Sequence, residues 1–190
     1  IISKGRYESR YTMKALDRLG LQYYVAVEPQ EVELYKAVLN PKYATVLELP
    51  FSNHGIGSGP ARNWVWDHSM TLGAKRHWVL DDNISDFWIY NNNRRFRADT
   101  GAFFLATEDF VDRFTNVPLA GLQYKFFVVD NTYSYKPFVI NTRMMSCILI
   151  ENTCPHRWRG KYNEDVDLSL RVLKDGYCTI LMYQFLAGKM

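Results

Sequence analysis

The stretch HWVLDDNIS, residues 77–85, joins an apolar segment to two adjacent acids and an amide. Residues 78–80 have the composition of a buried strand, and Asp81, Asp82 and Asn83 follow directly at its end. Ligands of parallel α/β sheets bind beyond the C-terminal ends of the strands, and paired carboxylates suit Mg²⁺ or Mn²⁺. Asp and Asn are also common turn residues. Taken alone, the triplet favours a turn over a metal site.

Short apolar runs alternate with helical patterns around this stretch. Strands are predicted at residues 1–2, 23–28, 44–49 and 77–80, and helices at 12–19, 31–39 and 60–72. Such strand–helix repetition is typical of a parallel sheet with helices on both faces.

The second half of the chain is less regular. A polar, basic loop is expected at 91–101, a helix at 107–114 with Thr107 as its N-cap, and strands at 121–129, 138–150 and 177–183. A further helix is predicted at 163–174, with Asn163 as its N-cap and Gly176 at its end. Antiparallel or mixed pairing is expected here, so the whole chain is predicted to be a single α/β domain with a mixed sheet flanked by helices.

Composition sets broad limits on function. The 190 residues fit one domain, and the net charge of +3 permits an anionic partner without requiring one. Three cysteines without CxxC spacing give neither a disulfide framework nor a zinc knuckle, so a reducing, cytoplasmic setting is expected. No apolar run approaches the roughly 20 residues of a membrane span, and no membrane partner is expected.

The glycine-rich loop HGIGSGPARN, residues 54–63, leads into a predicted helix. Its backbone amides and the positive helix end suit a phosphate group, although it matches neither a Walker A sequence nor GxGxxG, and its glycines serve equally well to turn the chain. Arg62 opposes the helix dipole at this position. We therefore expect Arg62 to reach an anion or a polar ring.

The segment YNEDVDLSLR, residues 162–171, places three acids at the start of a predicted helix. Glu164, Asp165 and Asp167 complement the helix dipole, which is sufficient reason for acids there. Three acids in five residues nevertheless exceed the needs of capping, and a carboxylate near a cleft can act as a general base. Alone, this segment favours the structural interpretation.

Each motif alone favours a structural role, but the order of the motifs along the chain favours a functional one. GSGPARNWVWDHSMTLGAKRHWVLDDN resembles the helix that leads into the DxD-type motif of GT-A nucleotide-sugar glycosyltransferases, and NEDVDLSLRVLKDG resembles their later motif, whose acid is the base in inverting members. Over residues 2–185, SKGRYESRYTMKAL, VAVEPQEVELY, LPFSN, GAKRHWVLDDNI and YNEDVDLSLRVLKDGY are similar to the TET-associated glycosyltransferases. That family occurs largely in phages and is linked to sugar addition on hydroxymethylated pyrimidines in DNA.

The resemblance implies a GT-A-like, Rossmann-like domain that binds a UDP-sugar through residues 1–90 and carries acceptor binding and catalysis in 91–190. Ser3 and Arg6 would border the nucleotide, and Glu28 would hold its uracil or ribose. An infected bacterial cytoplasm would be its location.

The ARN helix and the two acidic motifs receive roles in the same way. Arg62 would reach the base of the donor, with Asn63 supporting the helix. Asp81 would contact the ribose and join Asp82 in holding Mn²⁺ or Mg²⁺.

The resemblance also implies the catalytic residues. Asp165 would be the general base, with Glu164 as its alternative. Asn83 departs from the DxD-type pattern, because a neutral amide is a weaker metal ligand than a carboxylate.

DNA is the acceptor that the resemblance implies. The basic stretches at 91–97 and 154–162 would follow the DNA backbone, with Phe96 or Trp158 stacking on bases. A protein, a surface polysaccharide or a small molecule are alternative acceptors. A nucleotide- or nucleic-acid-binding module that has lost catalysis is a third reading, and the acidic pairs argue against it.

Overall fold

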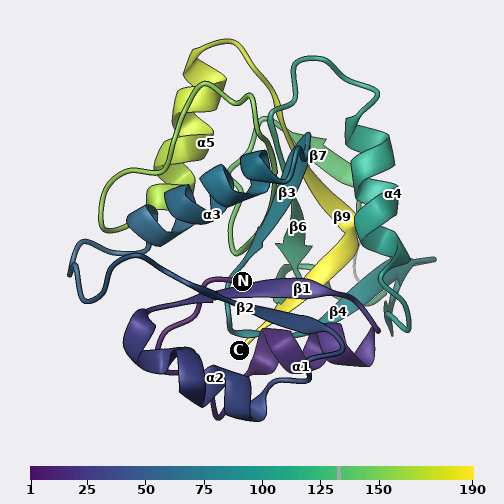
Figure 1. The fold of residues 1–190 in the computed structure, drawn as a ribbon. Coiled ribbons are helices and arrows are strands. Elements are labelled where there is room, and N and C mark those ends of the chain that lie inside the picture. Colours follow the sequence, from purple (N-terminus) through teal and green to yellow (C-terminus); the bar gives the residue numbers. More distant parts are fainter. Residues whose placement is uncertain (132–133) are drawn as a thin grey trace.

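A mixed sheet of seven strands forms the centre of the protein (Figure 1). The structure is a computed structural model that describes residues 1–131 and 134–190. The strand order is β3-β8-β6-β9-β4-β5, with β7 also paired to β9. The strands are β3 (Arg76–Leu80), β4 (Ile84–Asn91), β5 (Arg94–Arg97), β6 (Leu119–Tyr124), β7 (Phe138–Ile140), β8 (Cys147–Glu151) and β9 (Thr179–Lys189).

A small parallel sheet of β1 (Tyr23–Val27) and β2 (Ala44–Glu48) lies beside the large one. Ile2 joins the two sheets, because it forms parallel bridges to Ala26 in β1 and to Asp81 at the end of β3. The amide of Met190 donates to the Asn83 carbonyl at 3.0 Å. Both ends of the chain therefore lie at the turn after β3 (Figure 1).

Helices cover both faces of the large sheet. The helices are α1 (Tyr11–Arg18), α2 (Val32–Val38), α3 (Gly59–Thr71), α4 (Ala102–Val111) and α5 (Glu164–Lys174), with 3-10 turns η1 (Pro29–Glu31) and η2 (Lys125–Phe127). Leu16 of α1 and Phe103 of α4 pack in one core with Leu149 of β8. Trp66 of α3 and Leu168 of α5 pack on the opposite face. None of the described helices is long and apolar enough to cross a membrane.

The predicted fold class is confirmed, since the protein is a single α/β domain with a mixed sheet flanked by helices. The parallel pairing suggested by the strand–helix repetition of the first half is found in part, because among the described strands β1–β2 and β6–β9 pair in parallel and the other pairs are antiparallel. Strands β3 and β4, from residues 1–90, pair with β8 and β9 of the second half. The two proposed functional halves thus share one sheet.

The predicted loop at 91–101 is wrong in part, because β4 and β5 form a hairpin there. Asn92 and Asn93 have φ values of 49° and 58°, which a two-residue type I′ turn requires. The runs 121–129 and 138–150 are also not continuous strands. The first passes into η2 at Lys125, and residues 141–146 separate β7 from β8.

The predicted N-cap at Thr107 is wrong as well. Helix α4 begins at Ala102, so Thr107 lies inside it and its hydroxyl donates to the Phe103 carbonyl at 2.8 Å. The aromatic residues before Thr107 pack into the core, and this packing extends the helix toward its N-terminus. Asn163 is the N-cap residue of α5, as predicted, although its side chain makes no capping hydrogen bond.

Candidate active site

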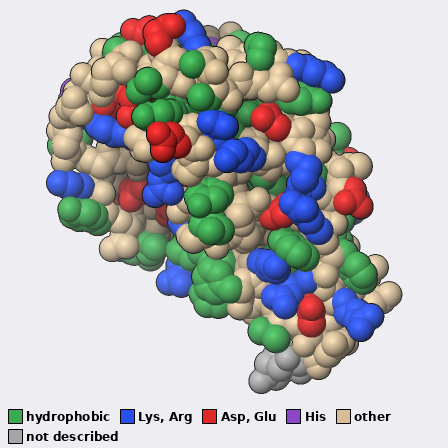
Figure 2. Space-filling model, turned by 90° about the horizontal axis from the view of Figure 1, so that it is seen from below, with side chains coloured by type: hydrophobic (Ala, Val, Ile, Leu, Met, Phe, Trp, Pro, Cys, Tyr) green, Lys and Arg blue, Asp and Glu red, His purple; other side chains and the backbone are tan. Residues whose placement is uncertain are grey.

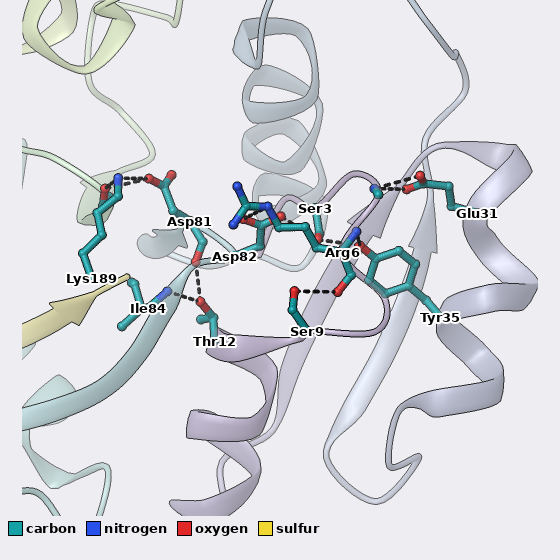
Figure 3. A network of polar contacts seen from close by, with 12 residues as sticks. Ser3, Arg6, Ser9, Thr12, Glu31, Tyr35, Asp81, Asp82, Ile84 and Lys189 are labelled. Atoms are coloured by element: carbon teal, nitrogen blue, oxygen red, sulfur yellow. Dashed lines mark hydrogen bonds and ion pairs between the residues drawn. The ribbon is translucent and has the colours of Figure 1, made fainter.

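The turn between β3 and β4 is fixed by a buried threonine of α1. The Thr12 hydroxyl donates to the Asp81 carbonyl at 2.6 Å and accepts the Ile84 amide at 2.8 Å (Figure 3). Asp82 and Asn83 lie between these two anchored positions. The turn and the site are thus one structure, because the turn presents the acids of HWVLDDNIS.

Asp81 has both carboxylate oxygens engaged. Oδ1 accepts Arg62 Nη2 at 2.8 Å, while Oδ2 accepts the Ser146 hydroxyl at 2.6 Å and Lys189 Nζ at 3.0 Å. Burial raises the pKa of Asp81, but Arg62, Ser146 and Lys189 outweigh burial, so the pKa lies below its ordinary value. Asp81 is therefore a stable anion held between two cations.

Asp82 is held more loosely. Its Oδ2 accepts the Ser3 hydroxyl at 2.8 Å, and its Oδ1 lies 3.4 Å from Arg6 Nε (Figure 3). The Tyr35 hydroxyl contacts the Ser3 hydroxyl at 2.6 Å and accepts the Arg6 amide at 3.1 Å. Burial raises the pKa of Asp82, opposed by Ser3 and Arg6. The buried Ser3 orients Asp82, whereas Arg6 remains half exposed.

Arg62 connects the two acidic motifs. Its side chain is 5% exposed and lies 4.5 Å from the centre of the Trp158 ring. Besides Asp81, its nitrogens lie 3.7 Å from Glu164 Oε1 and 3.4 Å from Asp165 Oδ1. The predicted anionic partner of Arg62 is confirmed within the protein. Contact with a donor base stays a prediction, which these internal partners disfavour.

Asp165 lies in the first turn of α5, and its Oδ1 is buried without a hydrogen-bond partner among the described residues. Burial raises the pKa of Asp165; Arg62 opposes this, and the charges of Asp81 and Glu164 add to it. Glu164 instead accepts the Ser58 hydroxyl at 2.6 Å. Of the two acids, Asp165 has the properties of a general base, since its pKa is raised and its Oδ1 accepts no hydrogen bond within the described residues.

A cavity of about 210 Å³ lies where these motifs meet. Its lining combines the β3–β4 turn with the start of α3 and the N-terminal segment: Ile2, Arg6, Ser58, Arg62, Val79, Leu80, Asp81, Asp82 and Asn83. Asn83 Oδ1 is buried without a hydrogen-bond partner in the part of the chain that the structure describes. Such an oxygen is free to accept a hydrogen bond or to bind a cation.

The ARN helix also holds the loop at residues 154–162. The side-chain amide of Asn63 donates to the Trp158 carbonyl at 2.9 Å and accepts the Trp158 amide at 3.0 Å. A Cβ on Gly57 would lie 2.7 Å from the Lys161 carbonyl, so the glycine permits this close approach. Asn63 thus ties α3 to this loop, and its role in a donor-binding helix stays a prediction. The stacking of Trp158 on DNA was wrong, because its ring is 3% exposed and covers Arg62.

Glu28 is set apart from this cluster. Its oxygens accept Lys4 Nζ at 2.9 Å, Gln30 Nε2 at 2.6 Å and the Asn53 amide at 3.1 Å. Burial raises the pKa of Glu28. These hydrogen bonds have the larger combined effect, so the pKa lies below the ordinary value. It does not line the cavity. Its role toward a uracil or ribose stays a prediction.

Four residues of the site gave no signal in the sequence: Thr12, Tyr35, Ser146 and Lys189. Ser146 has a φ of 58° and its hydroxyl contacts Tyr124 at 2.5 Å, whereas Lys189 comes from the end of β9. Long-range strand pairing brings Ser146 and Lys189 to Asp81, and no local pattern encodes such pairing.

The residues fit a divalent cation only in part. Among the described residues, no group of three or more His, Cys, Asp or Glu side chains is arranged to hold a metal ion. Asp82 Oδ1 and the unpartnered Asn83 Oδ1 are oxygen ligands of the kind that Mg²⁺ prefers. Asp81 does not fit this role, because hydrogen bonds and cations occupy both its oxygens.

Comparison with known proteins agrees with this arrangement of motifs. No curated protein matches the chain. The model of the TET-associated glycosyltransferase family matches residues 1–190, which is the whole chain. The protein therefore belongs to the TET-associated glycosyltransferase family.

Proposed function

We propose that the protein moves a sugar from a nucleotide-sugar donor, a UDP-sugar, to hydroxymethylated pyrimidine bases in DNA, with inversion at the sugar. Membership of the family establishes glycosyl transfer. The observation that carries the finer proposal is the Arg62 guanidinium, which joins Asp81 at the cavity to Asp165 on α5. Arg62 thereby holds Asp81, on the donor side, close to Asp165, the candidate base.

The diphosphate end of the donor is assigned to the cavity at the β3–β4 turn. The volume of about 210 Å³ is below the roughly 300 Å³ of a small-molecule pocket, so it takes part of the donor only. Arg6 is the half-exposed cation at its mouth and neutralises phosphate charge. Asp82 and Asn83 would hold a divalent cation, which when bound stabilises the negative charge on the leaving diphosphate.

Asp165 is assigned the proton transfer. Its carboxylate accepts the proton of the acceptor hydroxyl as the hydroxyl oxygen bonds to the anomeric carbon. The bond from that carbon to the diphosphate oxygen breaks, and its electron pair leaves with the diphosphate. A single displacement of this kind inverts the anomeric centre. The raised pKa of Asp165 makes it a stronger base than an ordinary aspartate.

Exposed aromatic and basic residues on the second half support a nucleic-acid acceptor. Phe96 in β5 and Phe126 in η2 are 52% and 57% exposed, and Lys125 lies beside Phe126. Arg95 connects the two elements, because its Nη1 lies 3.4 Å from the Lys125 carbonyl. Figure 2 shows Lys and Arg side chains interspersed with hydrophobic ones over one face of the molecule. Single-stranded nucleic acids bind surfaces of this composition.

Mass spectrometry of DNA tests the proposal. DNA with 5-hydroxymethylcytosine or 5-hydroxymethyluracil is incubated with the protein, Mn²⁺ and a panel of nucleotide sugars. The expected result is the mass gain of one sugar per modified base, absent from unmodified DNA and from the Asp165→Asn variant. Sugar transfer to a protein or polysaccharide acceptor, with no gain on any DNA, would reassign the acceptor.

A further inference from the structure

A second and larger cleft lies between α5, the end of β6 and the middle of β9. Its volume is about 650 Å³, within the roughly 300–1,000 Å³ of small-molecule sites. Aromatic rings and polar side chains line the cleft. The aromatic residues are Tyr124, Phe127 and Tyr183, and the polar ones are Gln123, Asn141 and Arg143. No sequence motif pointed to this cleft.

The aromatic walls of the cleft come from separate elements. Phe127 belongs to η2 and is 47% exposed, although it has an apolar ring. Tyr183 lies in the part of β9 where the pairing with β6 shifts register. Such irregularities re-aim side chains and are frequent next to active sites. Tyr183 is half-buried, and one side of its ring stacks on Tyr135 with the ring centres 5.8 Å apart. Aromatic rings that line a cleft suit a planar ligand that stacks on them.

The polar groups of the cleft suit a base that carries a phosphate. Gln123 Oε1 accepts the Tyr124 amide at 2.8 Å, which leaves the NH₂ group of Gln123 as a donor. Asn141 offers a second exposed amide. Arg143 is exposed and makes no ion pair within residues 1–131 and 134–190. An unpaired guanidinium favours an anionic ligand over a neutral polysaccharide.

The inner end of the cleft adjoins the candidate base. Val166, next to Asp165 in the chain, and Met145, next to Ser146, both line the cleft. The Ser146 backbone amide bonds to the Asp165 carboxylate, and the Ser146 hydroxyl lies 2.6 Å from Asp81 Oδ2. The cleft lining thus comes within one residue of Ser146 and Asp165, and Asp81, which Ser146 contacts, lines the donor cavity.

We propose that this cleft binds one pyrimidine nucleotide of the acceptor. The base stacks on Phe127 and Tyr183, its polar edge bonds to the amides of Gln123 and Asn141, and Arg143 binds the adjoining phosphate. The inference rests on the proposed function and specifies where its acceptor is bound. A base in this cleft has left the DNA stack, as enzymes that modify bases require.

Binding of 5-hydroxymethyl-2′-deoxycytidine 5′-monophosphate, followed by NMR titration, tests the cleft directly. Phe127→Ala and Arg143→Ala should each weaken binding about tenfold, through lost stacking and lost phosphate contact. Phe114→Ala and Arg113→Ala, at the end of α4 and outside the cleft lining, are the matched controls and should bind as the unchanged protein does. The corresponding nucleoside, which lacks the phosphate, should bind the unchanged protein and Arg143→Ala equally.

The possible results separate this inference from the proposed function. Binding with these dependences but no transfer to hydroxymethylated DNA supports the cleft and overturns the proposed reaction. Transfer with an unchanged KM for DNA in both cleft variants overturns the cleft and leaves the reaction standing. Absence of nucleotide binding by the unchanged protein, or equal displacement of the nucleotide by a neutral oligosaccharide, also overturns the cleft assignment.

Discussion

The guanidinium of Arg62 donates to Asp81 Oδ1 at 2.8 Å, and this ion pair links the start of α3 to the end of β3. The same buried side chain faces Glu164 and Asp165 on α5. One cation therefore balances acids from both of the motifs that the sequence suggested for donor binding and catalysis.

Arg62→Ala should lower the free energy of unfolding by about 3 kcal/mol, because the variant leaves buried carboxylates uncompensated. Urea unfolding followed by circular dichroism measures the loss. Arg62→Lys should recover part of it, since a single ammonium cannot serve several carboxylates as the guanidinium fork does. An Arg62→Ala protein as stable as the unchanged one would contradict the role of Arg62 as the shared cation.

Asp165→Asn should reduce kcat by about 10²- to 10⁴-fold, the usual contribution of a general base. Donor affinity should change little, because the donor cavity is lined by other residues. Steady-state transfer assays and UDP titration measure the two effects. Asp175→Asn, at the far end of α5, is the control and should retain activity. Near-normal turnover in Asp165→Asn would remove Asp165 from the mechanism.

The pH dependence of transfer should reflect the raised pKa of Asp165. Asp165 acts only when deprotonated, so the rate should fall as pH decreases through its pKa. This acid limb should lie above pH 3.9, about the ordinary value for aspartate. Arg62 lowers the pKa of Asp165, so Arg62→Lys, with a weaker hold on the carboxylate, should shift the limb to higher pH. A pH–rate profile of kcat/KM for each protein checks both statements.

Asp82→Ala should weaken donor binding in the presence of Mn²⁺ but not in its absence. The reason is that Asp82 Oδ1 is the carboxylate oxygen of the cavity with only a long ion pair, to Arg6. Calorimetric titration of UDP with and without Mn²⁺ measures the difference. Asn83→Asp should enlarge the effect of Mn²⁺ by adding a charged ligand, whereas Asp109→Asn on α4 should leave it unchanged. Equal UDP affinity of Asp82→Ala and the unchanged protein under both conditions would exclude Asp82 as a metal ligand.

Stability should fall between pH 6.5 and pH 4 because of His77. Burial lowers the pKa of His77 to about 4 from an ordinary value of 6.5. Between these pH values His77 is protonated in the unfolded chain but neutral in the folded protein. The free energy of unfolding therefore decreases as pH falls from 6.5 to 4. The expected loss is about 3 kcal/mol. Unfolding midpoints at several pH values measure it, and His77→Gln should flatten the slope. Equal slopes in the two proteins would contradict the assignment.

The sequence predicted most of the local structure in the first half of the chain. The helix at 12–19 and the strands at 23–28, 44–49 and 77–80 match elements of the structure to within about two residues. Their apolar patterns and end signals are local, so they can be read without knowledge of the fold. The hairpin at Asn92 and Asn93 could also have been found, since paired Asn residues tolerate the left-handed conformation of a tight turn.

Only those residues of the site that stand in a recognisable sequence motif could be predicted. Arg62, Asp81, Asp82 and Asp165 stand in recognisable segments, and the structure brings them together. Lys189 reaches Asp81 from 108 positions away, and neither residue reveals the contact by its neighbours. The internal partners of Arg62 and the burial of Trp158 follow from tertiary packing, which no local pattern reveals.

The position of β9 has a consequence for how the protein is made. This strand pairs with β4, β6 and β7, and it is the last described element to leave the ribosome. Until it emerges, β4 and β6 lack a shared neighbour, and Asp81 lacks the ammonium group of Lys189. Closure of the sheet and completion of the charged cluster therefore depend on the same strand. A nascent chain that has not yet added β9 has neither a sealed core nor an assembled site.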